Sequence, residues 1–189
     1  MFLKPDYNLE NVYKINFEEL KQQGIKCLMF DLDSTVMVSK SGRFTKATLD
    51  WFDTFINDFE VAIISNNKND QYIEKACQLA PCKVIGWANK PNPKIMGEYL
   101  DSVNIEPKNA VMIGDRPLTD ILAGKLLGCK TILVGSINPT ENLPTKFVRA
   151  LERSTIRKFI KLGLSFIQRN SFSLQRQIHT KTGRNITLY

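Results

Sequence analysis

Two aspartates follow an apolar run in the stretch CLMFDLDSTV, which spans residues 27–36. Asp31 and Asp33 are separated by one residue, so in an extended chain their carboxylates face the same side. Two more aspartates, Asp115 and Asp120, occur in the polar segment GDRPLTD. Carboxylates that lie close together repel one another unless some are protonated or a cation lies among them. We therefore expect a cation wherever the fold brings these side chains together.

A hydroxyl, an amide and a lysine add groups that can bind phosphate. Ser65 and Asn66 offer hydrogen-bond donors, and Lys90 offers a positive charge to phosphate oxygens. Carboxylates without a nearby His or Cys are hard oxygen ligands, and this donor set favours Mg²⁺. An aspartate beside Mg²⁺ and phosphate can attack phosphorus, and a second aspartate can carry protons. The residue types therefore predict a magnesium–phosphate site.

The elements that must position these residues alternate between strands and helices. Short apolar runs predict strands buried on both faces, at 25–30, 61–64, 110–113 and 131–134, with 83–87 as a weaker fifth. Apolar residues at helical spacing predict helices over 45–58, 69–80, 91–103 and 118–128. A capped short helix is expected before the first strand, from Asn16, Glu19 and Gly24. This alternation implies right-handed βαβ units and a parallel α/β sheet.

Each candidate site residue lies just after a predicted strand. Ligands of open α/β sheets bind at the carboxyl ends of the strands. The acids, the hydroxyl, the amide and the lysine are therefore expected to meet along one edge of one sheet.

The motifs resemble those of haloacid dehalogenase (HAD)-type phosphatases in order and spacing. They are D-x-D-x-T at 31–35, Ser65 after the next strand, K-P-x-P at 90–93 and G-D-x-x-x-x-D at 114–120. Within that superfamily the chain is similar to the YqeG branch of subclass IIIA, over roughly residues 1–165. Members of that branch are linked to phosphatidylglycerophosphate phosphatases. The resemblance implies a three-layer α/β/α Rossmannoid sheet without a large cap domain, because residues 36–60 and 66–89 leave no room for one.

The resemblance also implies roles for the acids. Asp31 corresponds to the nucleophile and a metal ligand. Asp33 corresponds to the general acid and base, and would offer its backbone carbonyl to Mg²⁺. Asp115 corresponds to an acidic metal ligand, and Asp120 to a further ligand or a support for one.

The phosphate-binding residues follow in the same way. Ser65 with the Asn66 amide corresponds to the phosphate-binding turn, and Lys90 to the charge that steadies phosphate and nucleophile.

Two positions depart from the pattern. Ser34 stands where this branch often has Asn, and Arg116 lies in a lengthened polar loop, where it could alter substrate preference.

Structural interpretations of the same residues stay open at this point. Asp31 and Asp33 could form only a strand-end turn, and Ser65 could cap the following helix. Lys94, on the same helix as Lys90, is the rival phosphate ligand. Asp120 could serve only to stabilise a helix start through its dipole.

The basic character of the chain belongs to its C-terminal part. Of the 189 residues, 1–145 hold 16 Lys and Arg against 18 Asp and Glu, whereas 146–189 hold 10 against the single acid Glu152. We expect a phosphatase core over 1–145 with a helical lead-in at 1–24, a basic amphipathic helix over 146–169 and an irregular tail over 170–189.

The basic helix suggests an acidic partner. It would lie on an anionic membrane surface, pack on the protein's own core, or contact RNA. The leading hypothesis is a Mg²⁺-dependent phosphatase acting on phosphatidylglycerophosphate, with a cytoplasmic location on the inner face of a membrane. The alternatives are a soluble phosphatase for sugar phosphates, nucleotides or phosphoproteins, and an RNA- or ribosome-associated binding module.

Overall fold

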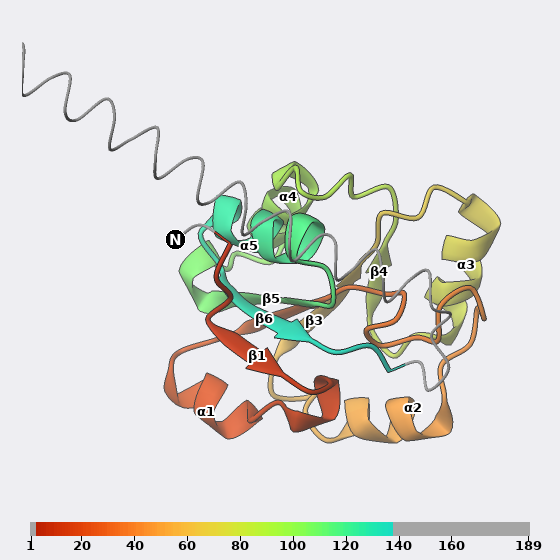
Figure 1. The fold of residues 1–189 in the computed structure, drawn as a ribbon, viewed down its shortest axis with the longest axis horizontal. Coiled ribbons are helices and arrows are strands. Elements are labelled where there is room, and N and C mark those ends of the chain that lie inside the picture. The colour runs from red at the N-terminus through yellow and green to blue at the C-terminus, as the bar shows by residue number, and fades with distance from the viewer. Residues whose placement is uncertain (1–2, 138–189) are drawn as a thin grey trace, which may run out of the picture. The chain divides into compact units, whose positions relative to one another are not determined.

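The computed structural model describes residues 3–137 of the chain, and a six-stranded parallel sheet forms their centre (Figure 1). The strands are β1 (Tyr7–Leu9), β2 (Cys27–Phe30), β3 (Glu60–Ile64), β4 (Lys83–Ile85), β5 (Ala110–Gly114) and β6 (Lys130–Val134). Their order across the sheet is β1-β6-β5-β2-β3-β4, and every neighbouring pair is parallel. The direction of winding therefore reverses at β2, which places a topological switch point beside its carboxyl end.

Helices cover both faces of the sheet. They are α1 (Phe17–Gln22), α2 (Lys46–Asp53), α3 (Asp70–Leu79), α4 (Lys94–Ser102) and α5 (Leu122–Leu127), with a π-helical turn over Pro117–Ile121 and 3₁₀ turns over Val12–Lys14 and Pro107–Asn109. Figure 1 shows α1 and α2 on one side of the sheet and α4 and α5 on the other. The three-layer α/β/α architecture is therefore confirmed.

Two apolar clusters hold these layers together. In β2, Leu28 and Phe30 belong to the cluster under α1 and α2, whereas Cys27 and Met29 belong to the cluster under α4 and α5. All four side chains are fully buried. Burial on both faces explains why the strands appear in the sequence as continuous apolar runs rather than as alternating patterns.

The lead-in contains a strand that the sequence did not predict. Besides the expected helix, residues 7–9 form β1, which pairs with β6 so that Tyr7 lies opposite Ile132. Asp6 secures this edge, because its carboxylate accepts hydrogen bonds from the backbone N–H and the hydroxyl of Thr131, at 2.8 and 2.9 Å. The strand depends on this distant pairing, since its three residues form no apolar run.

Helix ends follow local chemistry closely. The Asn16 side chain accepts from Glu19 N and so caps α1 as expected, and Gly128 ends α5 with a φ of 88°. The predicted helix over 91–103 starts only at Lys94, after its prolines, and the predicted helix over 45–58 ends at Asp53. The predicted helix over 118–128 is divided between the π-helical turn and α5.

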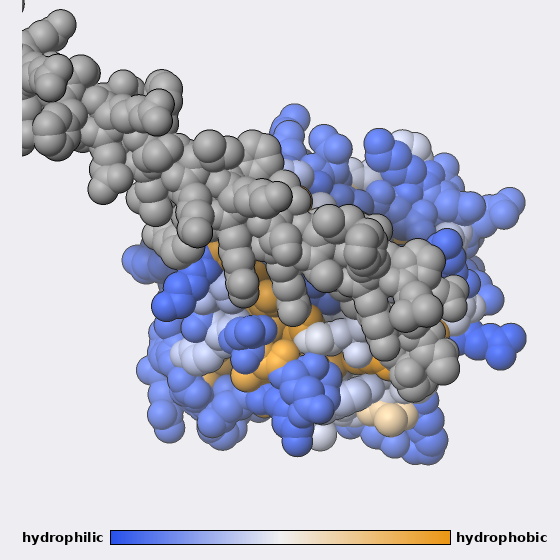
Figure 2. All heavy atoms as spheres, viewed as in Figure 1, coloured by the Kyte–Doolittle hydropathy of each residue, from blue (hydrophilic) through white to orange (hydrophobic). Residues whose placement is uncertain are grey.

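Hydrophilic side chains dominate the outer helices, and hydrophobic ones show toward the middle of the face drawn in Figure 2. None of the helices within residues 3–137 has the length and apolar content that crossing a membrane requires. The predicted basic helix over 146–169 and the predicted tail over 170–189 lie outside the described residues.

Candidate active site

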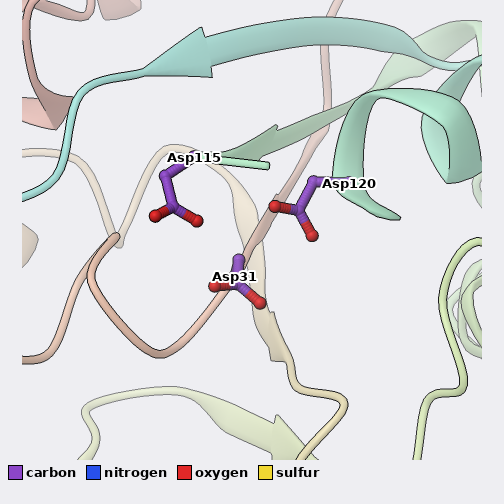
Figure 3. Close-up of side chains that lie close together, drawn as sticks. All are labelled: Asp31, Asp115 and Asp120. Atoms are coloured by element: carbon purple, nitrogen blue, oxygen red, sulfur yellow. The ribbon is translucent and has the colours of Figure 1, made fainter. Parts of the chain in front are cut away.

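The site is built where β2 and β5 end side by side. Phe30 pairs with Ile113 across these strands, and the Asp31 N–H donates to the Ile113 carbonyl at 2.8 Å. Asp31 and Asp115 therefore leave the sheet next to each other. The π-helical turn after β5 adds Asp120, and carboxylate oxygens of the three acids lie within 4.8 Å of one another. Figure 3 shows the three side chains converging on a common space.

The absence of a side chain at position 114 makes room for Asp120. A Cβ added to Gly114 would overlap the Asp120 carboxylate, which is fully buried. That carboxylate also accepts a hydrogen bond from the Arg116 N–H at 3.0 Å, and so stabilises the turn it belongs to. Asp120 therefore combines both interpretations left open by the sequence, because it caps a turn and lies among the acids.

Lys90 joins two of the acids. Its ammonium lies 2.6 Å from Asp31 Oδ1 and 2.7 Å from Asp120 Oδ1, and its side chain is 1 % exposed. The rival Lys94 has a side chain that is 73 % exposed and pairs with Glu98 on its own helix. The structure therefore brings Lys90, and not Lys94, into the cluster.

Asn66 fixes the backbone of Lys90. The Lys90 N–H donates to Asn66 Oδ1 at 2.6 Å, and Asn66 Nδ2 donates to the Lys90 carbonyl at 2.9 Å. This pair of hydrogen bonds ties the end of β3 to the loop after β4. The Asn66 side chain thus positions the lysine, a role that the sequence did not predict.

Burial and charge together set the protonation of this cluster. Burial raises the pKa of Asp31 to about 7, an effect that the Lys90 charge opposes and the Asp120 and Asp33 charges reinforce. Burial alone would lower the pKa of Lys90, but the charges of Asp120 and Asp31 outweigh it, so the pKa rises. Three acids with one lysine leave an excess of negative charge among hard oxygen donors. The donor set therefore fits a divalent cation that prefers oxygen ligands.

Asp33 lines the same pocket as Asp31 but makes its own hydrogen bonds. Its Oδ1 accepts hydrogen bonds from the Tyr72 hydroxyl at 2.7 Å and from the Lys40 N–H at 3.1 Å. Its carboxylate is not part of the cluster formed by Asp31, Asp115 and Asp120. The sequence predicts that the Asp33 backbone carbonyl binds the metal and that its side chain carries protons. Both predicted roles are compatible with this arrangement.

Ser65 lies at the end of β3 and does not cap the next helix. Its Oγ accepts from the Asn67 N–H at 3.1 Å, whereas Asn69 caps α3. A pocket of about 170 Å³ opens here. Its lining residues are Asp31, Asp33, Ser65, Asn66, Asn67, Lys90, Arg116 and Thr119. All the predicted phosphate ligands therefore border one space.

A second hollow of about 450 Å³ adjoins the first and shares Asp33 and Asn67 with it. Its other lining residues are Ser39, Lys40, Asn69 and Tyr72. Three of the residues that line the two hollows were not predicted from the sequence, namely Asn67, Thr119 and Tyr72. Tyr72 had a usable indication, because it lies in the first turn of a helix that starts at the carboxyl end of a strand.

The atypical Ser34 adopts a backbone conformation that favours Asn. Its φ is 69°, in the left-handed region that Asn tolerates better than most residues. The Ser34 N–H donates to the Met37 carbonyl at 2.8 Å, which closes the turn directly after the aspartate pair. An Asn would therefore adopt this backbone conformation more easily than Ser does.

A doubly wound sheet with buried acids, a lysine and a hydroxyl at its switch point defines a class of phosphate-handling α/β enzymes. The family model described as HAD-hydrolase-like matches residues 87–149. A probable phosphatase YqeG from Bacillus subtilis is 29 % identical over 163 residues, which cover 86 % of this chain and 94 % of that protein. These likenesses indicate that the chain is a phosphatase similar to the HAD-like hydrolases.

Two further likenesses are more distant. Phosphatidylglycerophosphate phosphatase 1 from Arabidopsis thaliana is 25 % identical over 173 residues, which cover 86 % of this chain and 50 % of that protein. The chain thus spans only half of that relative. The crystal structure of an uncharacterized protein from Listeria monocytogenes serotype 4b shares the fold, with a TM-score of 0.50 at 15 % identity, over 62 % of this chain and 85 % of that one.

Proposed function

We propose that the chain hydrolyses phosphate monoesters through a phosphorylated Asp31. The observation that carries this proposal is the position of Asp31, hydrogen-bonded to Lys90 at 2.6 Å on the wall of a pocket lined by phosphate-binding groups. The lysine holds the attacking carboxylate and supplies positive charge where phosphate oxygens would lie. An activated carboxylate beside such a charge is the arrangement that nucleophilic phosphoryl transfer needs.

The chain's own residues divide the reaction between them. Asp31 attacks phosphorus, and Asp33 protonates the departing alcohol. Asp33, now a carboxylate, then takes a proton from the water that hydrolyses the aspartyl-phosphate. This step releases inorganic phosphate, frees Asp31 as a carboxylate and returns Asp33 to its protonated form. Ser65 and the backbone N–H of Asn66 hold phosphate oxygens. Asp31, Asp115, Asp120 and the Asp33 carbonyl would hold Mg²⁺, which neutralises phosphate charge when it is bound.

We further propose phosphatidylglycerophosphate as the substrate. The likeness to the Arabidopsis phosphatase, which covers most of this chain, supports this choice. Residues 36–60 and 66–89 hold only α2, α3 and β4, so a phosphate that protrudes from a bulky lipid surface has access. The basic segment 146–169 would add attraction to anionic lipid at the cytoplasmic face of a membrane.

Phosphate release from vesicles that contain phosphatidylglycerophosphate tests the proposal, with Mg²⁺ and then with EDTA. Asp31→Asn removes the nucleophile with little change in shape, and should lower turnover at least a hundredfold, about 2.7 kcal/mol at the transition state. Asp53→Asn, an exposed residue at the end of α2, is the matched control and should retain wild-type turnover.

Each outcome has a clear meaning. Turnover by Asp31→Asn at the wild-type rate would contradict the mechanism. Faster turnover of soluble sugar phosphates, nucleotides or phosphoproteins than of the lipid would keep the mechanism and reject the substrate. Tail-dependent RNA binding without any phosphate release would reject both.

A further inference from the structure

Trp87 is the most exposed large apolar side chain in the described part of the chain, at 52 %. It follows β4, so it lies at the carboxyl edge of the sheet, where the active-site loops are. Its backbone N–H donates to the Asn67 carbonyl at 3.1 Å, and Asn67 lines both active-site hollows. The Trp87 backbone is therefore bonded directly to a residue that lines the active-site hollows.

Local contacts hold the Trp87 side chain in its exposed position. Its indole N–H donates to Asp70 Oδ1 at 2.8 Å, and its φ of 55° is a left-handed value that bulky residues rarely adopt. The preceding Gly86 packs so closely on Ile73 that a Cβ at position 86 would lie 2.7 Å from Ile73 Cγ1. Since the only polar atom of the ring is already bonded, the exposed remainder is apolar surface without compensation from water.

Basic side chains dominate the loops at this edge of the sheet, and the indole itself has the Lys68 ammonium and the Asp70 carboxylate as neighbours. In the loops after β2, β3, β4 and β5, every exposed charged residue is basic, and these residues, here called the basic rim, are Lys40, Arg43, Lys68 and Arg116. The Lys68 ammonium lies 5.9 Å from the centroid of the Trp87 ring. The loops at the opposite, amino edge of the sheet are balanced, with Lys26 and Lys108 against Asp58 and Glu106. The charge is therefore concentrated where substrate enters.

The rim and the site share one opening. Arg116 and Asn67 border the phosphate pocket, and Lys40 and Asn67 border the adjoining hollow. A flat anionic surface that contacted the rim would thus present its phosphate groups to the pocket.

We infer that the basic rim and Trp87 form a docking surface for an anionic lipid bilayer, with the indole as its interfacial anchor. The inference rests on the proposed function and adds a membrane contact at the catalytic edge itself, independent of the C-terminal basic segment. Indoles favour the boundary between lipid and water, and basic side chains near anionic lipid strengthen the contact. The Lys68 ammonium lies over the ring, which leaves a poorer platform for a stacked nucleotide base.

Co-sedimentation of the full chain with phosphatidylcholine vesicles, with and without phosphatidylglycerol, tests the inference. Trp87→Asn, which suits the left-handed backbone, and Lys68→Glu should each weaken binding to the anionic vesicles roughly fivefold or more. The matched controls are Leu126→Asn, an exposed apolar residue at the end of α5, and Lys26→Glu at the amino edge. Both controls should bind as the wild type does.

Fluorescence gives a second, local measurement. The protein has only two tryptophans, so the difference between the wild-type and Trp87→Phe emission spectra reports Trp87. Anionic vesicles should shift this difference spectrum to shorter wavelength, and pure phosphatidylcholine vesicles should not. Hydrolysis of a soluble phosphate monoester, measured in parallel, should be equal in the wild type, Trp87→Asn and Lys68→Glu.

Several results would overturn the inference. The first is a Trp87 difference spectrum that anionic vesicles do not shift. The second is vesicle binding by Trp87→Asn and Lys68→Glu that equals the wild type. The third is that, in a parallel assay, these variants lose binding to single-stranded RNA but not to vesicles. Any of these alongside normal hydrolysis of the soluble ester would reject the docking surface and leave the phosphatase mechanism standing. If the wild type bound the vesicles but did not hydrolyse the soluble ester, the mechanism would be rejected instead.

Discussion

The Tyr72 hydroxyl donates a hydrogen bond to Asp33 Oδ1 across 2.7 Å, from the first turn of α3 to the loop after β2. This contact links a residue from outside the sequence motifs to the proposed proton carrier. Burial and the neighbouring Asp33 both raise the pKa of Tyr72, so the hydroxyl keeps its proton and acts as a donor. Tyr72 therefore occupies one oxygen of Asp33, and in the proposed mechanism it orients the carboxyl group for proton transfer through the other.

Tyr72→Phe should lower turnover of alkyl phosphates roughly ten- to hundredfold, because a hydrogen bond to a charged group contributes roughly 1.5–3 kcal/mol. The loss should be much smaller for p-nitrophenyl phosphate, whose leaving group departs without a proton. Comparing kcat for the two esters checks this prediction. An equal loss on both would show that Tyr72 is only structural.

Gly114→Ala should lower activity strongly. The new methyl group would overlap the Asp120 carboxylate and displace it from Lys90, which lies 2.7 Å away. Because this clash is buried, we expect a destabilisation of about 1–3 kcal/mol as well. Gly97→Ala in α4 is the control, since its Cβ would meet only Leu127 Cδ1 at 3.4 Å. Urea unfolding and kcat/KM of both variants test the prediction, and equal behaviour would contradict it.

Mg²⁺ should raise the melting temperature of the protein. Asp31, Asp115 and Asp120 gather three carboxylates around the single Lys90 ammonium, so a bound cation would relieve their remaining repulsion. A ligand at 100 times its dissociation constant stabilises by about 2.7 kcal/mol. Asp115→Asn should remove most of this increase while the variant remains folded. Thermal unfolding with Mg²⁺ and with EDTA measures the effect, and an unchanged shift in the variant would mean that the ion binds elsewhere.

Asp6 should make the stability of the β1 edge depend on pH. Partial burial would raise its pKa, but hydrogen bonds from Lys125 and Thr131 outweigh burial and hold the pKa below its ordinary value of 3.8. A carboxyl whose pKa is lower in the folded state stabilises the protein above its unfolded pKa, and that stabilisation is lost as the pH falls through the folded pKa.

Asp6→Asn should therefore cost up to about 1 kcal/mol at pH 7, because the carboxylate is 38 % exposed and solvent screens its charge. This difference from the wild type should vanish below the folded pKa of Asp6. Urea unfolding of both proteins from pH 7 down to pH 3 measures it. Lys46, whose ion pair with Asp50 is exposed on α2, offers a control, because solvent screens that pair and Lys46→Gln should leave stability unchanged. A difference at pH 7 that persists unchanged into acid would show that the Asp6 charge is not responsible.

The strand core and the location of the site could be predicted from residues because their physics is local. Continuous apolar runs such as 27–30 can only be strands buried on both faces when helices alternate with them. The alternation of strands and helices implies parallel strands, whose carboxyl ends lie on one edge of the sheet. Asp31, Ser65 and Asp115 each follow a strand, so the sequence predicts that they lie close together. The short β1 escaped prediction because three residues that pair with β6, more than a hundred positions away, carry no pattern of their own.

The sequence by itself determined which chemistry is present, since residue types at strand ends define the acids, the hydroxyl and the lysines. Only the tertiary structure decided between Lys90 and Lys94, because burial between Asp31 and Asp120 selects one of two lysines that sequence spacing treats alike. It also brought Tyr72 to Asp33 and Trp87 to the rim of the site. These relationships depend on packing between segments remote in sequence, which local periodicity and propensity do not encode.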